Sequence, residues 1–256
     1  MAGTLLQPLL LLLLSLALGS AGQAAQGNGE RILNGVECPR GTHPWQVVLF
    51  HNNTFLCAGV LINQRWVLTV AHCRKSDYLV QMGSDHLNIG TVQQIWATES
   101  FVHPQYDNRT YDHDLMLVKL SSPAKLSPNV RTIKLPTSCK FPGASCTVSG
   151  WGVTSMDVAP TFPLMLMCAN ANIISYKDCR KVYPVLLKKY IICAAPPVGL
   201  AYPCRADLGS PLMCEGSLQG LVSSGYYPCK PPFEPVIYTR LCMYRKWIIR
   251  TMKTNS

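Results

Sequence analysis

Short runs of hydrophobic residues recur along the chain, with turns rich in glycine and proline between them. The runs contain many β-branched and aromatic residues, which is typical of β-strands. Many short strands joined by turns favour an all-β barrel or sandwich over a helical fold. The predicted strands cover residues 45–50, 58–62, 66–70, 115–120, 146–151, 218–224 and 236–239.

The end of the chain has a helical pattern instead. Over residues 243–252 the apolar side chains of Trp247, Ile248 and Met252 recur at helical spacing, and basic residues lie between or beside them. This predicts a C-terminal amphipathic helix. Its basic face would suit heparin, although such residues more commonly serve to solvate an exposed helix face. The basic residues are Arg245, Lys246, Arg250 and Lys253.

The beginning of the chain resembles a secretory signal peptide. Residues 5–18 are rich in leucine, and the small residues at 19–22 provide a cleavage site near Gly22. A membrane anchor is the alternative, but the apolar run is shorter than the roughly 20 residues that a span needs, and Pro8 interrupts it. We therefore expect a secreted, extracellular protein without a membrane span.

The twelve cysteines predict disulfides, because an even cysteine count in a secreted chain is typical of a disulfide framework. No Cys-x-x-Cys pair occurs, so no zinc site is expected. The histidines do not form a metal-binding pattern either, and we expect them to lie on the surface, with no metal and no cofactor; these histidines are His43, His51, His86, His103 and His113.

Two further features bear on surface chemistry. Sequons at Asn52 and Asn108 predict N-glycosylation of surface loops. The net charge is +10, and the pI is about 9.1. Such a charge favours acidic partners, among them sulfated glycans, anionic lipid and acidic proteins. Nucleic acid is not expected, because no recognition motif accompanies the charge.

Five motifs resemble those of trypsin-like serine peptidases. They are an activation motif at residues 31–35, a histidine motif at 69–73, an aspartate motif at 112–117, a Ser-Gly-Trp-Gly turn at 149–152 and a nucleophile loop at 204–214. Along the chain the histidine motif comes first, the aspartate motif second and the nucleophile loop third, which is the order in chymotrypsin-type enzymes. The resemblance spans residues 31–255 and is nearest to the tissue kallikreins, in particular the skin chymotryptic type.

The resemblance implies an all-β fold of two packed six-stranded antiparallel Greek-key β-barrels, over about residues 32–140 and 141–242, with a C-terminal α-helix over about 243–254. It divides the chain into a signal peptide (1–22), an activation propeptide (23–31) and a peptidase domain (32–256). It also pairs the twelve cysteines, which sequence alone leaves open. The implied bridges are Cys38–Cys168, Cys57–Cys73, Cys139–Cys242, Cys146–Cys214, Cys179–Cys193 and Cys204–Cys229.

The resemblance also implies functional roles. His72 stands at the general base and Asp114 at the acid that orients it. In the family, cleavage after Arg31 frees the amino group of Ile32, which then pairs with Asp207. Either this activation switch is retained, or Asp207 persists only because a buried carboxylate is costly to replace.

The nucleophile loop departs from the family pattern Gly-Asp-Ser-Gly-Gly-Pro. Leu208 stands where the family has its catalytic serine, and a leucine cannot form an acyl-enzyme. Ala206 replaces a glycine of the oxyanion hole, whose donors are the backbone N–H groups at 206 and 208. Ser210 is the nearest hydroxyl, but it lies two residues further on, where the side chain is expected to point elsewhere.

The specificity pocket is altered as well. Tyr202 occupies the floor position, and Val236 replaces a glycine on the wall. Ser224 replaces the tryptophan that the family has between Ser223 and Gly225. Side chains of this size at positions 202 and 236 are expected to fill the pocket.

These features predict a monomeric, secreted, kallikrein-like serine-protease homologue without proteolytic activity. It would act by binding, as a decoy, regulator or partner of proteases, inhibitors or substrates, or as a ligand of an acidic surface such as a sulfated glycan. The alternative is a serine-type endopeptidase with residual or unusual activity. The residue at position 208 distinguishes the two, because catalysis of the family type requires a nucleophile there.

Overall fold

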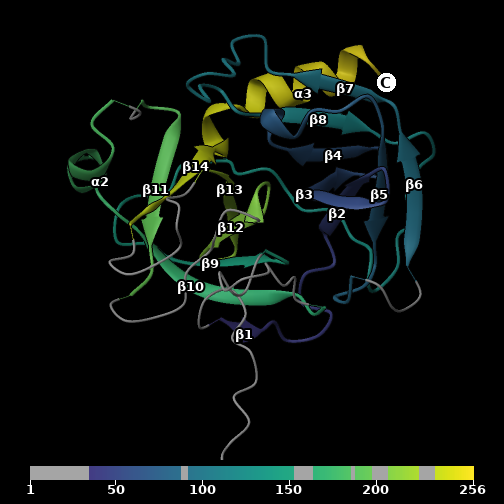
Figure 1. Ribbon diagram of the computed structural model, residues 1–256, viewed down its shortest axis with the longest axis horizontal. Helices are drawn as coiled ribbons and strands as arrows, with labels where there is room; N and C mark the ends of the chain where they lie inside the picture. Colours follow the sequence, from purple (N-terminus) through teal and green to yellow (C-terminus); the bar gives the residue numbers. More distant parts are fainter. Residues whose placement is uncertain (1–34, 88–91, 153–163, 186–187, 198–206, 225–233) are drawn as a thin grey trace, which may run out of the picture.

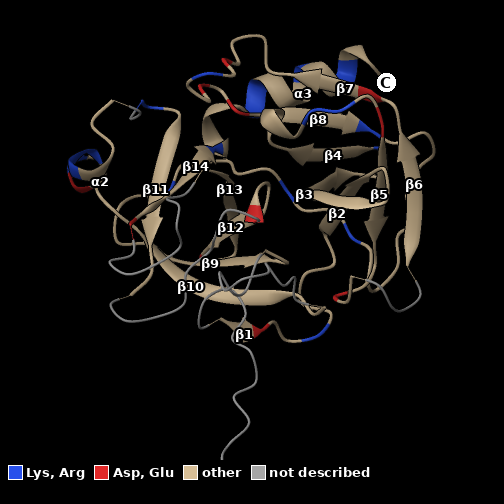
Figure 2. Cartoon of the chain, in the orientation of Figure 1, with Lys and Arg blue, Asp and Glu red and all other residues tan. Residues whose placement is uncertain are grey.

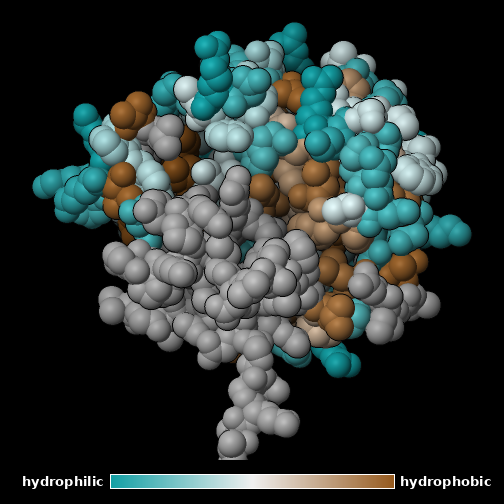
Figure 3. Space-filling model, in the orientation of Figure 1, coloured by the Kyte–Doolittle hydropathy of each residue, from teal (hydrophilic) through white to brown (hydrophobic). Residues whose placement is uncertain are grey.

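The computed structural model describes residues 35–87, 92–152, 164–185, 188–197, 207–224 and 234–256. Within these ranges the chain forms two curled antiparallel β-sheets, and a helix at the C-terminal end covers one of them (Figure 1). Hydrophilic side chains cover much of the rim of the molecule in the view of Figure 3. The predicted all-β architecture with a terminal helix is confirmed.

The first sheet has the strand order β6-β5-β2-β3-β4-β8-β7. Its two edge strands, β6 and β7, are separated in the chain only by Thr98, so the sheet curls back on itself. This interruption turns one of the six expected strands into two. The strands are β2 (Gln46–His51), β3 (Thr54–Asn63), β4 (Trp66–Thr69), β5 (Tyr78–Met82), β6 (Gln93–Ala97), β7 (Glu99–Val102) and β8 (Met116–Lys119).

The second sheet has the strand order β1-β10-β11-β14-β13-β12-β9, and a further pairing of β9 with β10 closes it. The two-residue strand β1 pairs with β10 outside this closed ring and accounts for the seventh strand. The strands are β1 (Val36–Glu37), β9 (Ser145–Gly150), β10 (Met167–Ile173), β11 (Ile191–Ala195), β12 (Pro211–Cys214), β13 (Ser217–Ser224) and β14 (Val236–Arg240).

Each sheet encloses its own apolar core. The first core is lined by buried residues of β2 to β8, among them Leu49, Leu68 and Leu117. The second is built from β9 to β14 and includes Leu212 and Tyr238. Burial of these side chains is the main force that holds each barrel together. Residues that touch both cores therefore lie where the barrels meet.

Two α-helices lie in the described residues. Helix α2 (Tyr176–Val182) begins at Ser175, whose hydroxyl accepts a hydrogen bond from the Asp178 N–H as an N-cap. Helix α3 (Arg245–Thr254) starts two residues later than predicted, because Leu241–Met243 form a 3-10 turn, η3. No helix in these ranges is long and apolar enough to cross a membrane.

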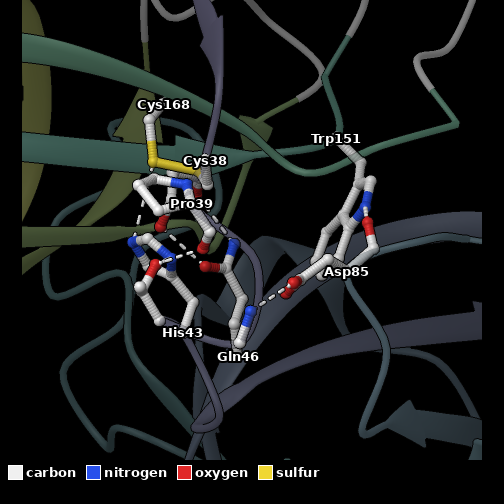
Figure 4. Close-up of a disulfide and its surroundings, with 10 residues drawn as sticks. Cys38, Pro39, His43, Gln46, Asp85, Trp151 and Cys168 are labelled. Atoms are coloured by element: carbon white, nitrogen blue, oxygen red, sulfur yellow. Dashed lines mark hydrogen bonds between the residues drawn. A yellow bond between two sulfur atoms is a disulfide. The ribbon is translucent and has the colours of Figure 1, made fainter.

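Five of the six expected disulfides are present, and the sixth, Cys204–Cys229, lies outside the described residues. The bridge between Cys38 and Cys168 ties the segment around β1 to β10, and the His43 ring lies against it (Figure 4). Nearby, the Trp151 indole donates to the Asp85 carbonyl at 3.0 Å. These contacts fasten the N-terminal end of the described chain next to the Ser-Gly-Trp-Gly turn.

Candidate active site

His72 and Asp114 come from two different parts of the first barrel and meet in a hydrogen-bonded pair. His72 lies in the 3-10 turn η1 (Ala71–Cys73), directly after β4, and Asp114 precedes β8. The Asp114 carboxylate accepts from the His72 backbone N–H at 3.0 Å and contacts the ring Nδ1 at 2.7 Å. A carboxylate at Nδ1 fixes the ring so that Nε2 is the nitrogen available as a base.

The second barrel supports Asp114. This carboxylate is 1% exposed, and it accepts a hydrogen bond from the Ser223 hydroxyl at 2.6 Å. The Asp114 carbonyl accepts from the Thr239 hydroxyl at 2.7 Å. Ser223 was predicted from sequence to line a specificity pocket, and the structure gives its hydroxyl a further contact, with the acid of the pair. Buried acceptors satisfied in this way hold the carboxylate in one position.

The other side of the His72 ring has no polar partner among the described residues. Its Nε2 atom is buried and makes no hydrogen bond there. The Tyr111 ring packs edge-on against the imidazole at a centroid distance of 5.2 Å. Tyr111 adopts a positive φ of 55°, which is uncommon for a bulky residue and places its ring over the histidine. The His72 ring is therefore held in one orientation, and no described group forms a hydrogen bond with its Nε2 atom.

The segment from Asp207 to Pro211 is anchored to both barrels. The Leu208 carbonyl accepts from Ala58 of β3 at 2.8 Å, and the Gly209 N–H donates to Val222 of β13, also at 2.8 Å. Val222 returns a hydrogen bond to the Ser210 carbonyl at 2.9 Å. The main chain of this loop is thus fixed in place by the scaffold, whatever side chain stands at position 208.

Three glycines make room for this loop. A Cβ on Gly209, whose φ is +82°, would collide with the Ala58 carbonyl. A Cβ on Gly150 or Gly152 would collide with the Asp207 carboxylate, which is fully buried. Gly152 also donates its N–H to Asp207 at 2.8 Å. Positions 150 and 152 of the Ser-Gly-Trp-Gly turn therefore require glycine, because the Asp207 carboxylate occupies the space that a larger side chain would need.

Comparisons with known proteins agree with this geometry. Residues 32–248 match the family model described as Trypsin. The chain belongs to the trypsin family. Kallikrein-7 of Homo sapiens is 52% identical over 256 residues and covers 100% of both chains. Kallikrein-15 of Saguinus oedipus is 41% identical over 257 residues, with 96% of this chain and 99% of the relative covered.

A solved relative shares the fold of this trypsin-family chain. The structure of neuropsin, a serine protease expressed in mouse brain, matches with a TM-score of 0.80 and 38% sequence identity. The match covers 85% of this chain and 98% of that chain. The close kallikrein homologues and this structure together place the protein among the kallikrein-like members of the trypsin family.

The structure describes only some of the predicted site residues. His72, Asp114 and Ser223 form one connected group, and Leu208 lies against the cores of both barrels. Val236 is 1% exposed and belongs to the second core. Ser224 is the last residue of β13. Tyr202, Ala206, Gly225, Arg31 and Ile32 lie outside the described residues.

The site also has a buried histidine that sequence analysis placed on the surface. His103 is only 9% exposed, because it stacks on His113 at 4.8 Å and contacts the rings of Tyr244 and Trp247. The expectation of a surface position was therefore wrong for His103. Aromatic residues from α3 and from the segment before it provide this burial, and their packing could not be read from the histidine's own neighbours in sequence.

Burial changes the acid–base behaviour of this cluster. It lowers the pKa of His103 from 6.5 to about 4, and repulsion from His113 adds to the effect. Burial also lowers the pKa of His113. Neutral imidazoles are thus favoured in the folded protein. His113 stacks in turn on Tyr190 at 3.9 Å and precedes Asp114, so the cluster connects α3 to the His72–Asp114 pair.

The folded protein is expected to lose stability as the pH is lowered from 7 to 5. In the unfolded chain His103 titrates near 6.5, so between pH 7 and 5 the unfolded chain binds more protons than the folded chain does. The free energy of unfolding therefore decreases as the pH is lowered. For His103 the loss should be roughly 1–2 kcal/mol. Urea unfolding at both pH values measures it. His103→Gln should flatten the pH dependence, and equal slopes for wild type and His103→Gln would contradict the prediction.

Proposed function

We propose that this trypsin-family protein is secreted, has no peptidase activity and acts by binding. The observation that carries the proposal is the residue at position 208. We assign Leu208 to the nucleophile position because residues 206–211 resemble the family motif, and its side chain packs against both apolar cores. A hydrocarbon side chain has no proton to give to His72 and no atom that can form an acyl-enzyme.

Ser210 does not provide a substitute nucleophile. Its side chain is fully buried, and its hydroxyl has no hydrogen-bond partner in the described part of the chain. Neither His72 Nε2 nor Ser210 Oγ has a partner there, so the two atoms are not bonded to each other. A nucleophile must lie within hydrogen-bond reach of its base. This favours a binding role over hydrolysis by a shifted serine.

The retained scaffold supports a role as a binding protein. Five disulfides, the anchored loop at 207–211 and the His72–Asp114 pair hold a trypsin-like scaffold around the site. A protease-like protein that cannot cleave its ligands would act as a decoy for inhibitors or substrates, or as a regulatory partner of an active protease. The protein is proposed to be a monomer that needs no cofactor.

The proposed secretion rests on the N-terminal segment and on the surface chemistry. The leucine-rich run followed by small residues up to Gly22 has the composition of a signal peptide. Both proposed glycosylation sites, Asn52 and Asn108, are exposed. Asn52 lies in the turn between β2 and β3, where a glycan would project away from the sheet. Expression in mammalian cells with and without a glycosidase treatment would test both sites.

The decisive experiment is labelling of the mature protein with a fluorophosphonate probe, beside an active kallikrein. We expect no labelling and no turnover of tryptic or chymotryptic peptides, because the probe requires an activated nucleophile. Ser210→Ala serves as the control for hidden activity. Turnover by pure protein that Ser210→Ala abolishes would establish instead the alternative, a serine-type endopeptidase with unusual chemistry.

A further inference from the structure

Helix α3 has one buried face and one strongly basic face. Ile248 is fully buried, and Trp247 and Met252 pack against the core of the first barrel. Because a helix has 3.6 residues per turn, the remaining positions point to solvent. The cations there are all exposed, and they are Arg245, Lys246, Arg250 and Lys253.

These cations have no acidic partners in the described part of the chain. The lysine ion pairs found there join Lys119 to Glu99, Lys140 to Glu215, Lys181 to Asp178 and Lys188 to Asp112, and none involves α3. The helix itself contains no aspartate or glutamate. In Figure 2 it carries only the blue of lysine and arginine among the charged residues. The positive charge is thus fully available to a ligand.

Stabilisation of the helix does not explain this charge. The partial positive charge at a helix N-terminus favours acids in the first turn and bases in the last. Helix α2 follows this rule, with Asp178 first and Arg180 and Lys181 last. Helix α3 has Arg245 and Lys246 in its first turn and no acid there. Lys253 lies in the last turn and suits the helix dipole, but Arg245 and Lys246 oppose it, so stabilisation of the helix does not account for the cations in the first turn.

We propose that the exposed face of α3 binds a sulfated glycosaminoglycan. With a rise of 1.5 Å per residue, Lys246, Arg250 and Lys253 fall within roughly 10 Å along one face. A row of closely spaced cations matches a polymer with closely spaced sulfates, and arginine can bind a sulfate with two parallel hydrogen bonds. The exposed Ile249 lies on the same face, where it can contact the sugar rings.

An anionic membrane fits this face less well. Amphipathic helices that bind membranes bury their apolar face between the lipids. In α3 that face is already occupied, because Ile248 and Trp247 pack into the protein core. Electrostatic attraction and the single exposed side chain of Ile249 would remain for a lipid surface, without an apolar face to insert. The inference depends on the proposed secretion, which would bring the protein to extracellular glycans, but not on the absence of peptidase activity.

Heparin binding tests the proposal. We compare the mature protein with two triple variants that each remove three positive charges: K246Q/R250Q/K253Q on α3 and K177Q/R180Q/K181Q on α2. Helix α2 packs on the second barrel, away from α3 (Figure 1). The α3 variant should lose at least about tenfold in affinity, and the slope of log K against log salt should fall by roughly two to three. The α2 variant should bind like wild type.

Several results would overturn the proposal. Equal losses in both variants would mean that only net charge matters, and unchanged binding by the α3 variant would place the glycan elsewhere. Binding of desulfated heparin as tightly as heparin would exclude sulfate recognition. Phosphatidylserine vesicles that bind through α3 when heparin does not would identify a lipid ligand. Matching melting temperatures of the three proteins establish that both variants are folded. A separate fluorophosphonate assay tests for peptidase activity, so failure of glycan binding can be distinguished from failure of the proposed function.

Discussion

Replacing Leu208 by serine is expected to leave the protein without efficient peptidase activity, even after cleavage at Arg31. The substitution supplies a hydroxyl within a loop whose backbone is already anchored to Ala58 and Val222. Substrate positioning, however, can account for ~7–11 kcal/mol of barrier lowering. The proposed obstruction of the pocket by Tyr202 and Val236 would remove much of that contribution.

The measurement is the kcat/KM of Leu208→Ser on chymotryptic and tryptic peptides, beside an active kallikrein. We expect it to remain at least ~10³-fold lower, because the oxyanion hole and substrate binding alone supply factors of that size. We expect that Ala206→Gly, Ser224→Trp and Val236→Gly are needed in addition to Leu208→Ser before efficient activity can return. If the single variant already approaches the active kallikrein, position 208 alone was limiting and the pocket is open.

Cleavage after Arg31 is expected to stabilise the loop around Asp207 without creating activity. A freed Ile32 ammonium can enter an apolar site only beside a carboxylate, and loss of one partner of such a buried pair costs ~3–5 kcal/mol. Asp207 is fully buried and accepts from Gly152. Asp207 is adjacent to Leu208, so the new ion pair would order the surface around position 208 that a partner contacts. The precursor and the cleaved form would then differ in partner binding.

Hydrogen exchange of residues 202–212 and urea unfolding test this switch. The form that begins at Ile32 should be more protected and more stable than the uncleavable Arg31→Gln precursor. Asp207→Asn should abolish that difference, whereas Asp178→Asn on the exposed surface of α2 should not. Identical protection before and after cleavage would show that Asp207 is only a structural remnant.

The seven strands predicted from hydrophobic runs all occur, because β-branched runs between turns leave few other conformations open. Strand β3 begins earlier than its apolar run, at Thr54. Its start is set by the turn at Asn52 and Asn53, whose φ values of 49° and 58° suit a tight hairpin. The split of one strand into β6 and β7 at Thr98 depends on how the sheet curls, which is a tertiary property.

The sequence motifs predicted the identity of the His72–Asp114 pair, but not the groups that hold it. The hydrogen bonds from Ser223 and Thr239 to Asp114 cross more than 100 residues of chain, with separations of 109 and 125. No local pattern encodes contacts of that range. The same holds for His103, whose burial depends on Tyr244 and Trp247 at the far end of the sequence.

The position of Leu208 between the two apolar cores has an evolutionary consequence. Active centres hold reactive groups at the expense of stability, and selection can relieve that strain once the chemistry is no longer needed. Under the proposed assignment of Leu208 to the nucleophile position, a reactive group would have been replaced by a contact with both apolar cores. A first step back to serine would weaken this contact before any substrate could be turned over. The proposed loss of catalysis would then be hard to reverse, because a serine at position 208 would give up this apolar contact before it gained a usable substrate pocket.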